Sequence, residues 1–451
     1  MDVLEELHGG QGWSRQNGQL SLIEAWAEGE ASAIRVEGQY VLTAEAVACE
    51  LELVEEATRR RSLICATPGD AIHLFMAAGD YRLFVRFLSP PGDYSASLRL
   101  DRQGRLDRLG FLAAKAIQVL QRPPSAWPEA LGRLLRRAPQ GVTGARLGAP
   151  VSAAPPPIPN RPTIEPAPVP ETAAVSIIIP TKTRADLLAA CVASLDPGPV
   201  RKELIIIDNG ATAHDMLGLL QGLAARSDIR VIRHDAPFNF SQLCNLGAKA
   251  ARFGTLLFLN DDIEALDREW LPAMLGFAAR PDTGVVGARL LYPSRDLQHA
   301  GVATNLIPGP GHPWRGLAET AWRDHPLIAA AGEVDAVTGA CLMIGKALFD
   351  QLGGFDEAAF AVSLNDVDLC LKARGRGLKV IYAPQATLLH KEGQSRRRDD
   401  DPAERARRER ELALFFDRYP HAARHSVFYP AWLRRDTDSG ASISSVASST
   451  L

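Results

Sequence analysis

The sequence predicts an α/β protein whose larger part is built on a mostly parallel, Rossmann-like sheet. After residue 174, apolar runs typical of buried strands alternate with helical patterns, as in a parallel sheet covered on both faces. Residues 139–173 contain ten prolines and separate this part from an N-terminal part in which apolar and polar residues alternate. At 451 residues the chain exceeds one comfortable core, so several domains are expected.

Residues 1–137 are predicted to form a β-rich module with a helical end. Short alternating runs separated by Gly-Asp and Pro-Gly turns favour a small antiparallel β-sandwich or barrel, and residues 110–137 carry a helical pattern. Sugar or partner binding and a structural or oligomerising role both stay open for this module. The alternating runs are 32–42, 49–54, 71–76, 81–88 and 94–100.

Residues 138–173 are predicted to be an extended, semi-stiff linker, because proline fixes φ and removes backbone donors. A polyproline ligand for a partner is the alternative. Residues 174–435 are predicted to be the α/β domain, and the low-complexity tail 436–451 is expected to be disordered. Strands are expected at 175–179, 204–207, 229–233, 256–259 and 285–290, with helices at 186–194, 214–226, 241–252 and 268–279.

Composition narrows the class of protein. A net charge of -3 predicts no binding to nucleic acid, and the six scattered cysteines lack metal or redox spacing, which indicates reduced, buried thiols. The N-terminus lacks the features of a signal peptide, and no run of about 18 apolar residues predicts a transmembrane segment. These features predict a cytoplasmic protein.

The strand 256–259 leads directly into Asn260-Asp261-Asp262. Ligands of open α/β sheets bind at the carboxyl ends of such strands. Two adjacent carboxylates repel each other and lose hydration there, so a divalent cation carrying an anionic ligand is one natural partner. Capping of a following helix by Asn260 and Asp261 is the other interpretation.

The two preceding strand ends are also polar. The first is followed by Pro180-Thr-Lys-Thr-Arg184, with donors for nucleotide oxygens, and the second by Asp208-Asn209-Gly210, whose carboxylate can accept a hydrogen bond from a ribose or a uracil. Neither the dinucleotide GxGxxG nor the Walker motif GxxxxGK[ST] is present.

Taken in series, these segments resemble glycosyltransferase family 2, the inverting transferases of GT-A fold, and most closely bacterial members that build O-antigen, including rhamnosyltransferase-like enzymes. The resemblance covers roughly residues 175–400 in the family's order and spacing. The matching segments are 175–181, 206–210, 238–250, 257–262, 287–293, 298–301, 337–342, 353–357, 365–372 and 390–395.

The resemblance implies a metal site and a donor. Asn260-Asp261-Asp262 stands at the family's Asp-x-Asp motif, with Asn in place of its first Asp, so the role of Asp261 between ribose and metal stays open. Asp262 and His390 are implied to hold Mg²⁺ or Mn²⁺, which in turn binds a UDP-, dTDP- or GDP-sugar. The residues implied to contact the nucleotide-sugar are Thr181, Arg184, Asp208, Asn209, Asn245, Asp261 and Arg396.

Asn365-Asp366 stands at the family's catalytic pair, and Asp366 is implied to be the base that deprotonates the acceptor hydroxyl. Asp368 points about 200° away on a helix and is expected to be a carboxylate in the first turn, favoured there by the helix dipole.

The charged segments 396–401 and 404–411 are expected to form a solvated helix face or a lid. Trp314 and Trp322 are expected either to stack on acceptor sugars or to pack in the core.

The sequence thus predicts an inverting, metal-dependent glycosyltransferase acting on a saccharide acceptor of the surface-polysaccharide type. A lipid-linked acceptor and peripheral contact with the inner membrane face are compatible with it. A sugar nucleotidyltransferase, the first alternative, would require a glycine-rich basic loop after the first strand, and residues 180–184 contain no glycine. A catalytically idle sugar-binding or scaffold protein would not need both Asp262 and Asp366.

Overall fold

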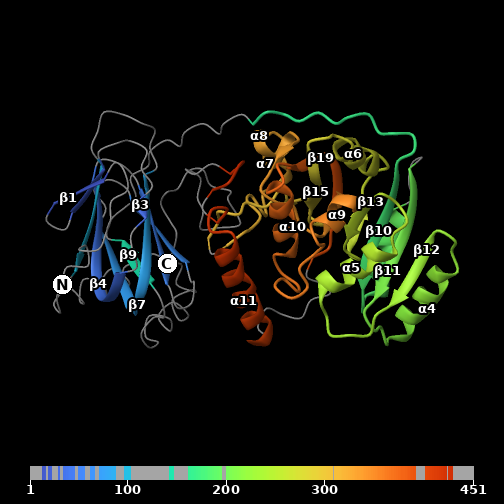
Figure 1. Ribbon diagram of the computed structural model, residues 1–451, viewed down its shortest axis with the longest axis horizontal. Helices are drawn as coiled ribbons and strands as arrows, with labels where there is room; N and C mark the ends of the chain where they lie inside the picture. The colour runs from blue at the N-terminus through green and yellow to red at the C-terminus, as the bar shows by residue number, and fades with distance from the viewer. Residues whose placement is uncertain are drawn as a thin grey trace. The chain divides into compact units, whose positions relative to one another are not determined.

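The computed structural model describes two parts of the chain. Between residues 13 and 146 it describes nine strands, and after them it describes residues 161–195, 200–307, 309–392, 402–423 and 425–429. The chain divides into two compact units, Met1–Pro156 and Pro157–Pro430 (Figure 1). The predicted helical segment 110–137 and the predicted tail 436–451 lie outside the described residues.

The N-terminal unit contains an antiparallel sheet in the order β1-β2-β8-β4-β7-β5-β6, with β3 and β9 also paired to β7. The expected alternating runs fall on these strands. Their bounds are β1 Trp13–Gln16, β2 Gln19–Leu22, β3 Gly29–Glu30, β4 Ile34–Glu45, β5 Cys49–Glu55, β6 Arg61–Ala66, β7 Ala71–Phe87, β8 Ala96–Arg102 and β9 Val142–Arg146.

Strand β9 departs from the expectation for the linker 138–173. Residues Val142–Arg146 pair antiparallel with β7, because the prolines at 139 and 150 flank this stretch without interrupting it. The predicted linker therefore includes one strand of the N-terminal sheet.

The C-terminal unit is built on a mixed sheet in the order β12-β11-β10-β13-β18-β15-β19-β14, with β16 on β15 and β17 on β19. The bounds are β10 Ala174–Thr181, β11 Arg201–Asp208, β12 Ile229–Arg233, β13 Thr255–Leu259, β14 Ile263–Ala265, β15 Thr283–Leu291, β16 Leu297–His299, β17 Gly332–Glu333, β18 Cys341–Gly345 and β19 Lys379–His390. β10 to β13 are parallel neighbours and β15 pairs parallel with β19, which confirms the predicted α/β class. The other pairings of this sheet are antiparallel, so the sheet as a whole is mixed.

One strand interrupts the parallel order in a way that the sequence did not predict. β18 lies antiparallel between β13 and β15. The chain between β15 and β18 contains only short helices and no long crossover helix within the described residues, so it returns to the sheet in the opposite direction.

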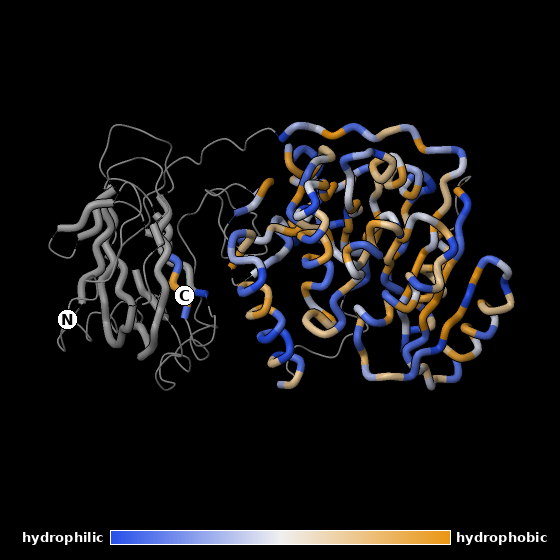
Figure 2. Tube along the Cα trace, in the orientation of Figure 1, coloured by the Kyte–Doolittle hydropathy of each residue, from blue (hydrophilic) through white to orange (hydrophobic). Residues whose placement is uncertain are grey.

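Helices cover both faces of this sheet. Side chains of Val175, Ile177 and Ile179 on β10 belong to the core under α3, α4 and α6, whereas Ile178 faces α5, where a Cβ on Gly247 would lie 2.4 Å from its Cγ2. Both faces are therefore buried, and Figure 2 shows long apolar stretches along these strands. The bounds are α3 Ala185–Ser194, α4 His214–Ala224, α5 Phe240–Ala250, α6 Trp270–Ala278, α7 Glu319–Trp322, α8 Pro326–Ala329, α9 Lys346–Gln351, α10 Asn365–Arg374 and α11 Pro402–Arg418.

Residues 161–173 form no helix or strand and are fastened to the C-terminal unit. The Arg161 guanidinium donates to the carbonyl oxygens of Glu333, Leu327 and Ala330. Backbone hydrogen bonds add Ile164 N to Ala331 O and Ala167 N to Gly276 O. We call residues 161–173 the strap. No helix in the described parts of the chain is long and apolar enough to cross a membrane.

Candidate active site

Polar side chains gather where β10, β11 and β13 end. These parallel strands bring Thr181, Asp208 and the segment 260–262 to the same edge of the sheet. The structure thus brings together the strand-end residues that the sequence predicted, at the edge where α/β sheets bind ligands.

Asp261 is held by the neighbouring strand end. The Thr181 hydroxyl donates to Asp261 Oδ2 over 2.6 Å. Burial raises the pKa of Asp261 to about 6, the hydrogen bond from Thr181 opposes this rise, and the adjacent Asp262 carboxylate adds to it. The carboxylate therefore loses hydration without a cationic partner within hydrogen-bond reach in the described structure.

Asp262 and His390 converge at the next position. β14 pairs antiparallel with β19, with Ile263 opposite His390, and this register brings His390 Nε2 to 3.1 Å from Asp262 Oδ1. The Asp262 side chain is 5% exposed, yet its Oδ1 has no hydrogen-bond partner among the described residues. Two ligand atoms thus approach one another without a hydrogen bond.

These two atoms fit a divalent cation. Cis ligands of an octahedral Mg²⁺ or Mn²⁺ lie about 3 Å apart, given metal–ligand distances near 2.1 Å. No group of three or more potential ligands from His, Cys, Asp and Glu occurs in the described residues. Sites for Mg²⁺ often take only one or two protein ligands and complete their shell with water and phosphate, so two ligands suit such a cation.

The alternative in which Asn260 and Asp261 cap a following helix is wrong. The chain continues from Asp262 into β14, and α6 begins only at Trp270. Asn260 instead donates its backbone N–H to Ala340 O over 3.0 Å, and its Nδ2 lies 3.3 Å from His390 Nε2.

Asp208 and Asn209 lie at the end of β11. Asp208 Oδ1 accepts from Ala211 N over 2.7 Å and Oδ2 accepts from Arg233 over 2.9 Å. The Asn209 side-chain amide donates to the carbonyl oxygens of His234 and Ala236, while its buried Oδ1 has no partner in the part of the chain described. Asn209 Oδ1 is thus a buried acceptor at this strand end without a partner among the described residues.

The remaining predicted nucleotide contacts fall in three different settings. Arg184 is half-buried before α3, donates two hydrogen bonds to Asp186 and lies within the electrostatic influence of Asp261 and Asp262. Asn245 lies apart from them. It donates to Phe355 O and to Glu357, and it accepts from Phe355 N, so its amide holds the turn at 353–357. Arg396 lies outside the described residues.

Asn245 thus supports a turn that needs glycine. Gly353 and Gly354 have φ of +80° and +69°, a region that favours glycine, and a Cβ on Gly354 would lie 2.7 Å from Asn245 Oδ1. A direct contact of Asn245 with a ligand competes with these hydrogen bonds, so its predicted place in the nucleotide site does not follow from the geometry.

Asp366 lies in the first turn of α10. Its Oδ2 accepts from Gly339 N over 2.7 Å and its Oδ1 from Val367 N over 2.8 Å, so both oxygens are oriented by backbone N–H groups. Ala340, next to Gly339, accepts the hydrogen bond from Asn260. Asp366 is therefore linked to Asn260 at the end of β13 through Gly339 and Ala340, with one hydrogen bond at each end of this pair.

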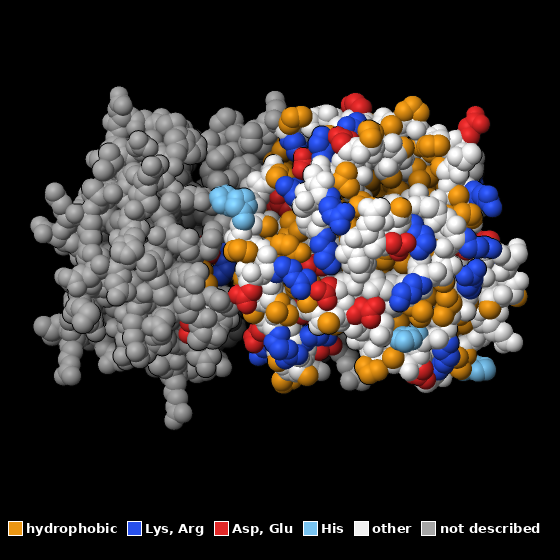
Figure 3. All heavy atoms as spheres, viewed as in Figure 1, with side chains coloured by type: hydrophobic (Ala, Val, Ile, Leu, Met, Phe, Trp, Pro, Cys, Tyr) orange, Lys and Arg blue, Asp and Glu red, His pale blue; other side chains and the backbone are white. Residues whose placement is uncertain are grey.

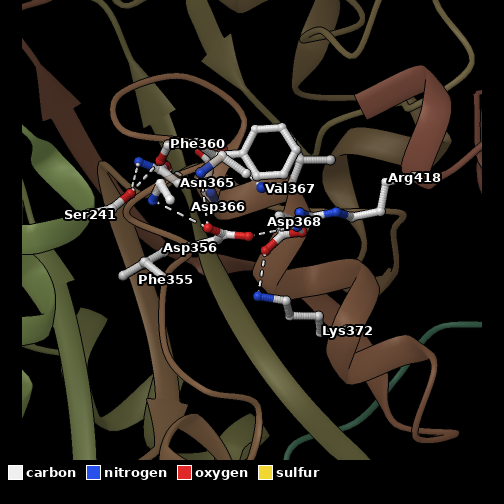
Figure 4. A network of polar contacts seen from close by, with 12 residues as sticks. Ser241, Phe355, Asp356, Phe360, Asn365, Asp366, Val367, Asp368, Lys372 and Arg418 are labelled. Carbon is white, nitrogen blue, oxygen red and sulfur yellow. Dashed lines mark hydrogen bonds and ion pairs between the residues drawn. The ribbon is translucent and has the colours of Figure 1, made fainter. Parts of the chain in front are cut away.

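Asp368 is turned away from this site, as expected two residues along a helix. Its side chain is fully buried, where Arg418 donates to Oδ1 over 2.8 Å, Tyr419 donates over 2.7 Å and Lys372 Nζ lies 2.6 Å from Oδ2 (Figure 4). Asp368 therefore ties α10 to the end of α11.

Residues 404–410 of helix α11 are exposed or half-buried, in agreement with the expected solvated face, but Glu411 departs from it. Glu411 is 3% exposed and accepts from the backbone N–H groups of Val362 and Ser363, just before α10. Basic and acidic side chains are intermixed on the surface of this unit (Figure 3). The sequence showed the charges of α11 but not that one of them is buried against the loop before Asp366.

A polar cluster behind His390 contains the residues that sequence reasoning missed. Gln298 Oε1 lies 2.7 Å from His390 Nδ1, and Glu392 accepts from both Gln298 and Arg315. Next to it, the Nδ1 atoms of His299 and His312 are 2.9 Å apart. The segment Gln298-His-Ala-Gly was visible in the sequence as a matching motif, but its partners are remote in the chain.

The two tryptophans that follow residues 309–313 belong to the core. Trp314 and Trp322 are 1% and 3% exposed, and Trp314 packs against His325, Phe428 and Tyr429. This excludes them as exposed stacking surfaces and leaves the alternative of core packing.

Known proteins resemble the part of the chain that forms this site. The family model Glycosyl transferase family 2 matches residues 176–328. O-antigen biosynthesis protein RfbC of Myxococcus xanthus is 37% identical over 245 residues, covering 52% of this chain and 18% of the relative. N-acetylglucosaminyl-diphospho-decaprenol L-rhamnosyltransferase of Mycobacterium tuberculosis is 32% identical over 184 residues, covering 37% of this chain and 56% of the relative.

The chain therefore spans less than two thirds of the length of these relatives. Among solved structures, mannosyltransferase PcManGT from Pyrobaculum calidifontis, in complex with GDP-Man and Mn²⁺, aligns with a TM-score of 0.42 and 17% identity, covering 58% of this chain and 68% of that chain.

Asp368→Asn is expected to lower the free energy of unfolding by about 2 kcal/mol, because it removes the buried negative charge that pairs with Arg418 and Lys372. Both cations are partly exposed, so the loss is smaller than for a fully buried ion pair. Asp356→Asn, which removes the other, more exposed partner of Arg418, is the matched control and is expected to cost about 0.5 kcal/mol. Urea unfolding measures both. Equal losses would contradict a structural role of Asp368.

Acid is expected to destabilise the C-terminal unit through His312. Burial lowers the pKa of His312 to about 4, helped by the charge of Arg315 and opposed by Glu392, with His299 and His390 also facing it. The unfolded chain binds this proton near pH 6.5, so stability is present above that pH and falls by up to about 3 kcal/mol as the pH drops to 4.

His312→Gln is therefore expected to make the loss of stability between pH 6.5 and 4 shallower, as measured by urea unfolding at several pH values. Measurements at pH 8, where the ring is neutral in both states, give the intrinsic cost of the substitution. Parallel pH profiles for the variant and the unaltered chain would contradict the assignment.

Proposed function

We propose that the chain is an inverting, metal-dependent glycosyltransferase, a proposal supported by the match of residues 176–328 to the family model Glycosyl transferase family 2. It transfers a sugar from a nucleoside-diphosphate sugar to a saccharide acceptor. The observation that carries this proposal is the convergence of Asp262 Oδ1 and His390 Nε2 without a hydrogen bond, on the same sheet edge as the oriented carboxylate of Asp366.

The first half of the site holds the leaving group. Asp262 and His390 would hold Mg²⁺ or Mn²⁺, which when bound neutralises the charge that develops on the departing nucleoside diphosphate. Thr181 and Asp261 form a hydrogen-bonded pair at the same edge, where Asp261 can accept from a ribose hydroxyl or join the water shell of the cation. Asp208, Asn209, Arg184 and Arg396 complete the proposed nucleotide site, with Asn245 acting only through the turn that it holds.

The second half activates the acceptor. Asp366 is the proposed base, which takes the proton of the attacking hydroxyl as the oxygen reaches the anomeric carbon. Hydrogen bonds from Gly339 N and Val367 N fix the direction of its carboxylate.

The named relatives support a surface-polysaccharide acceptor of the O-antigen type, and the second relative's name supports a lipid-linked one. The four described cysteines are buried and unpaired, which supports a cytoplasmic location, with peripheral contact at the inner membrane face. A hexosyl or deoxyhexosyl donor is proposed as UDP-, dTDP- or GDP-sugar.

A panel of UDP-, dTDP- and GDP-sugars with Mn²⁺ tests the proposal through donor hydrolysis and calorimetric binding. One donor is expected to bind only with the metal and to be hydrolysed slowly without acceptor. Binding without any turnover, even with saccharide acceptors, would favour a sugar-binding protein. Pyrophosphate release from a nucleoside triphosphate and a sugar phosphate would favour a nucleotidyltransferase.

Asp366→Asn is expected to lower the transfer rate at least about 100-fold while the donor dissociation constant stays within about twofold, because the base acts on the acceptor rather than on the donor. Rates and calorimetry on the same preparation measure both quantities. A large loss of donor affinity would contradict the base assignment and place Asp366 in the donor site.

A further inference from the structure

A chain of hydrogen bonds leads away from the metal-facing side of His390. Gln298 Oε1 lies 2.7 Å from His390 Nδ1, and Gln298 Nε2 donates to Glu392 Oε2 over 2.9 Å. The same Glu392 oxygen accepts from Arg315 Nη2 over 2.7 Å. Gln298 is 4% exposed, so its amide finds its partners within the protein.

This chain fixes which nitrogen of His390 carries a proton. Arg315 Nη2 forms an ion pair with Glu392 Oε2 over 2.7 Å, and the same oxygen accepts from Gln298, so Glu392 acts as an acceptor in this chain of hydrogen bonds. The NH₂ of Gln298 must therefore face Glu392, and its carbonyl oxygen must face His390. That oxygen also can only accept, so Nδ1 of His390 must be the N–H donor.

The opposite nitrogen is then bare in the neutral ring. His390 Nε2 lies 3.3 Å from the amide nitrogen of Asn260 and 3.1 Å from Asp262 Oδ1, with which no hydrogen bond is formed. The Asn260 amide donor agrees with a lone pair on Nε2, whereas Asp262 Oδ1 is a second acceptor that repels this lone pair. A cation bound by both Nε2 and Asp262 Oδ1 would remove the repulsion between their lone pairs.

Backbone geometry explains why Gln298 can reach His390. On β16, His299 pairs with Leu290 and Leu297 pairs with Leu291 of β15, so Gln298 is the extra residue of a β-bulge. A bulge re-aims the side chain of its extra residue relative to the regular alternation. β15 is also the neighbour of β19, which ends at His390.

We propose that Gln298 is a positioning residue that holds His390 as the Nδ1–H tautomer, so that Nε2 and Asp262 together present two lone pairs to a divalent cation. Glu392, fixed by Arg315, orients the Gln298 amide. The inference rests on the proposed function only in that the site takes a divalent cation; it does not depend on the donor, the acceptor or the base.

Binding of Mn²⁺ tests it without turnover. Electron paramagnetic resonance of free Mn²⁺ in titrations of the full chain gives the dissociation constant. Gln298→Met keeps the length of the side chain and removes both hydrogen bonds, and it is expected to weaken Mn²⁺ binding by about 10- to 100-fold. Gln242→Met is the matched control, because it breaks a Gln–His hydrogen bond of 2.9 Å, to His234 instead of His390. Its Mn²⁺ affinity is expected to equal that of the unaltered chain.

The tautomer itself is read by NMR of the chain labelled with ¹⁵N-histidine, at pH 8 and without metal, with the His390 signal assigned by its loss in His390→Gln. The unaltered chain is expected to show Nδ1–H, and Gln298→Met a shift toward Nε2–H. An Nε2–H tautomer in the unaltered chain overturns the proposal, even where Gln298→Met fails to fold.

The outcomes separate this inference from the proposed function. Unweakened Mn²⁺ binding by folded Gln298→Met overturns the role of Gln298 and leaves the transferase proposal standing. Absence of Mn²⁺ binding by the unaltered chain, with or without nucleotide, overturns both. Equal weakening by Gln298→Met and Gln242→Met shows a general loss of stability and also overturns the specific role.

Discussion

The loss of hydration by two adjacent carboxylates at the end of β13 is the constraint on which the arrangement of the site depends. Asp261 and Asp262 repel each other, so each needs its own partner. β10 supplies the Thr181 hydroxyl to one, and β19 brings His390 to the other. Since the two partners come from opposite sides of β13 in the sheet, both the parallel part and the antiparallel return of β14 are needed to hold the pair.

The second carboxylate region is joined to the first through the backbone. Ala340 accepts from the end of β13, and Gly339 donates to Asp366. On the other side of α10, Asp368 and the loop N–H groups bound by Glu411 anchor the helix to α11. A displacement of α10 would therefore strain both a buried ion pair and the strand end, which explains how two regions far apart in the sequence keep a fixed separation.

The sequence predicted what depends on local pattern. β10 to β13, β15 and the helices between them follow from apolar periodicity, and Asp261 and Asp262 follow from their place after a buried strand. It did not predict β18 or β9, because pairing partners and direction depend on contacts remote in the chain. It gave Asn245 a ligand role, whereas the packed structure uses its amide for a turn. Gln298 was seen only as part of a motif, because its meaning lies in a bulge and in two partners near residue 390.

The strap has a consequence for how such chains are assembled from modules. Apart from Arg161, the hydrogen bonds described for the strap use backbone groups at positions such as Ile164 and Ala167, so they tolerate wide variation in side chain. The C-terminal unit therefore begins structurally before its first strand, near residue 161. A domain boundary upstream of the strap therefore allows the preceding module to be exchanged during evolution without loss of these contacts. A boundary at residue 174 would instead leave the carbonyl oxygens that Arg161 binds without their donor.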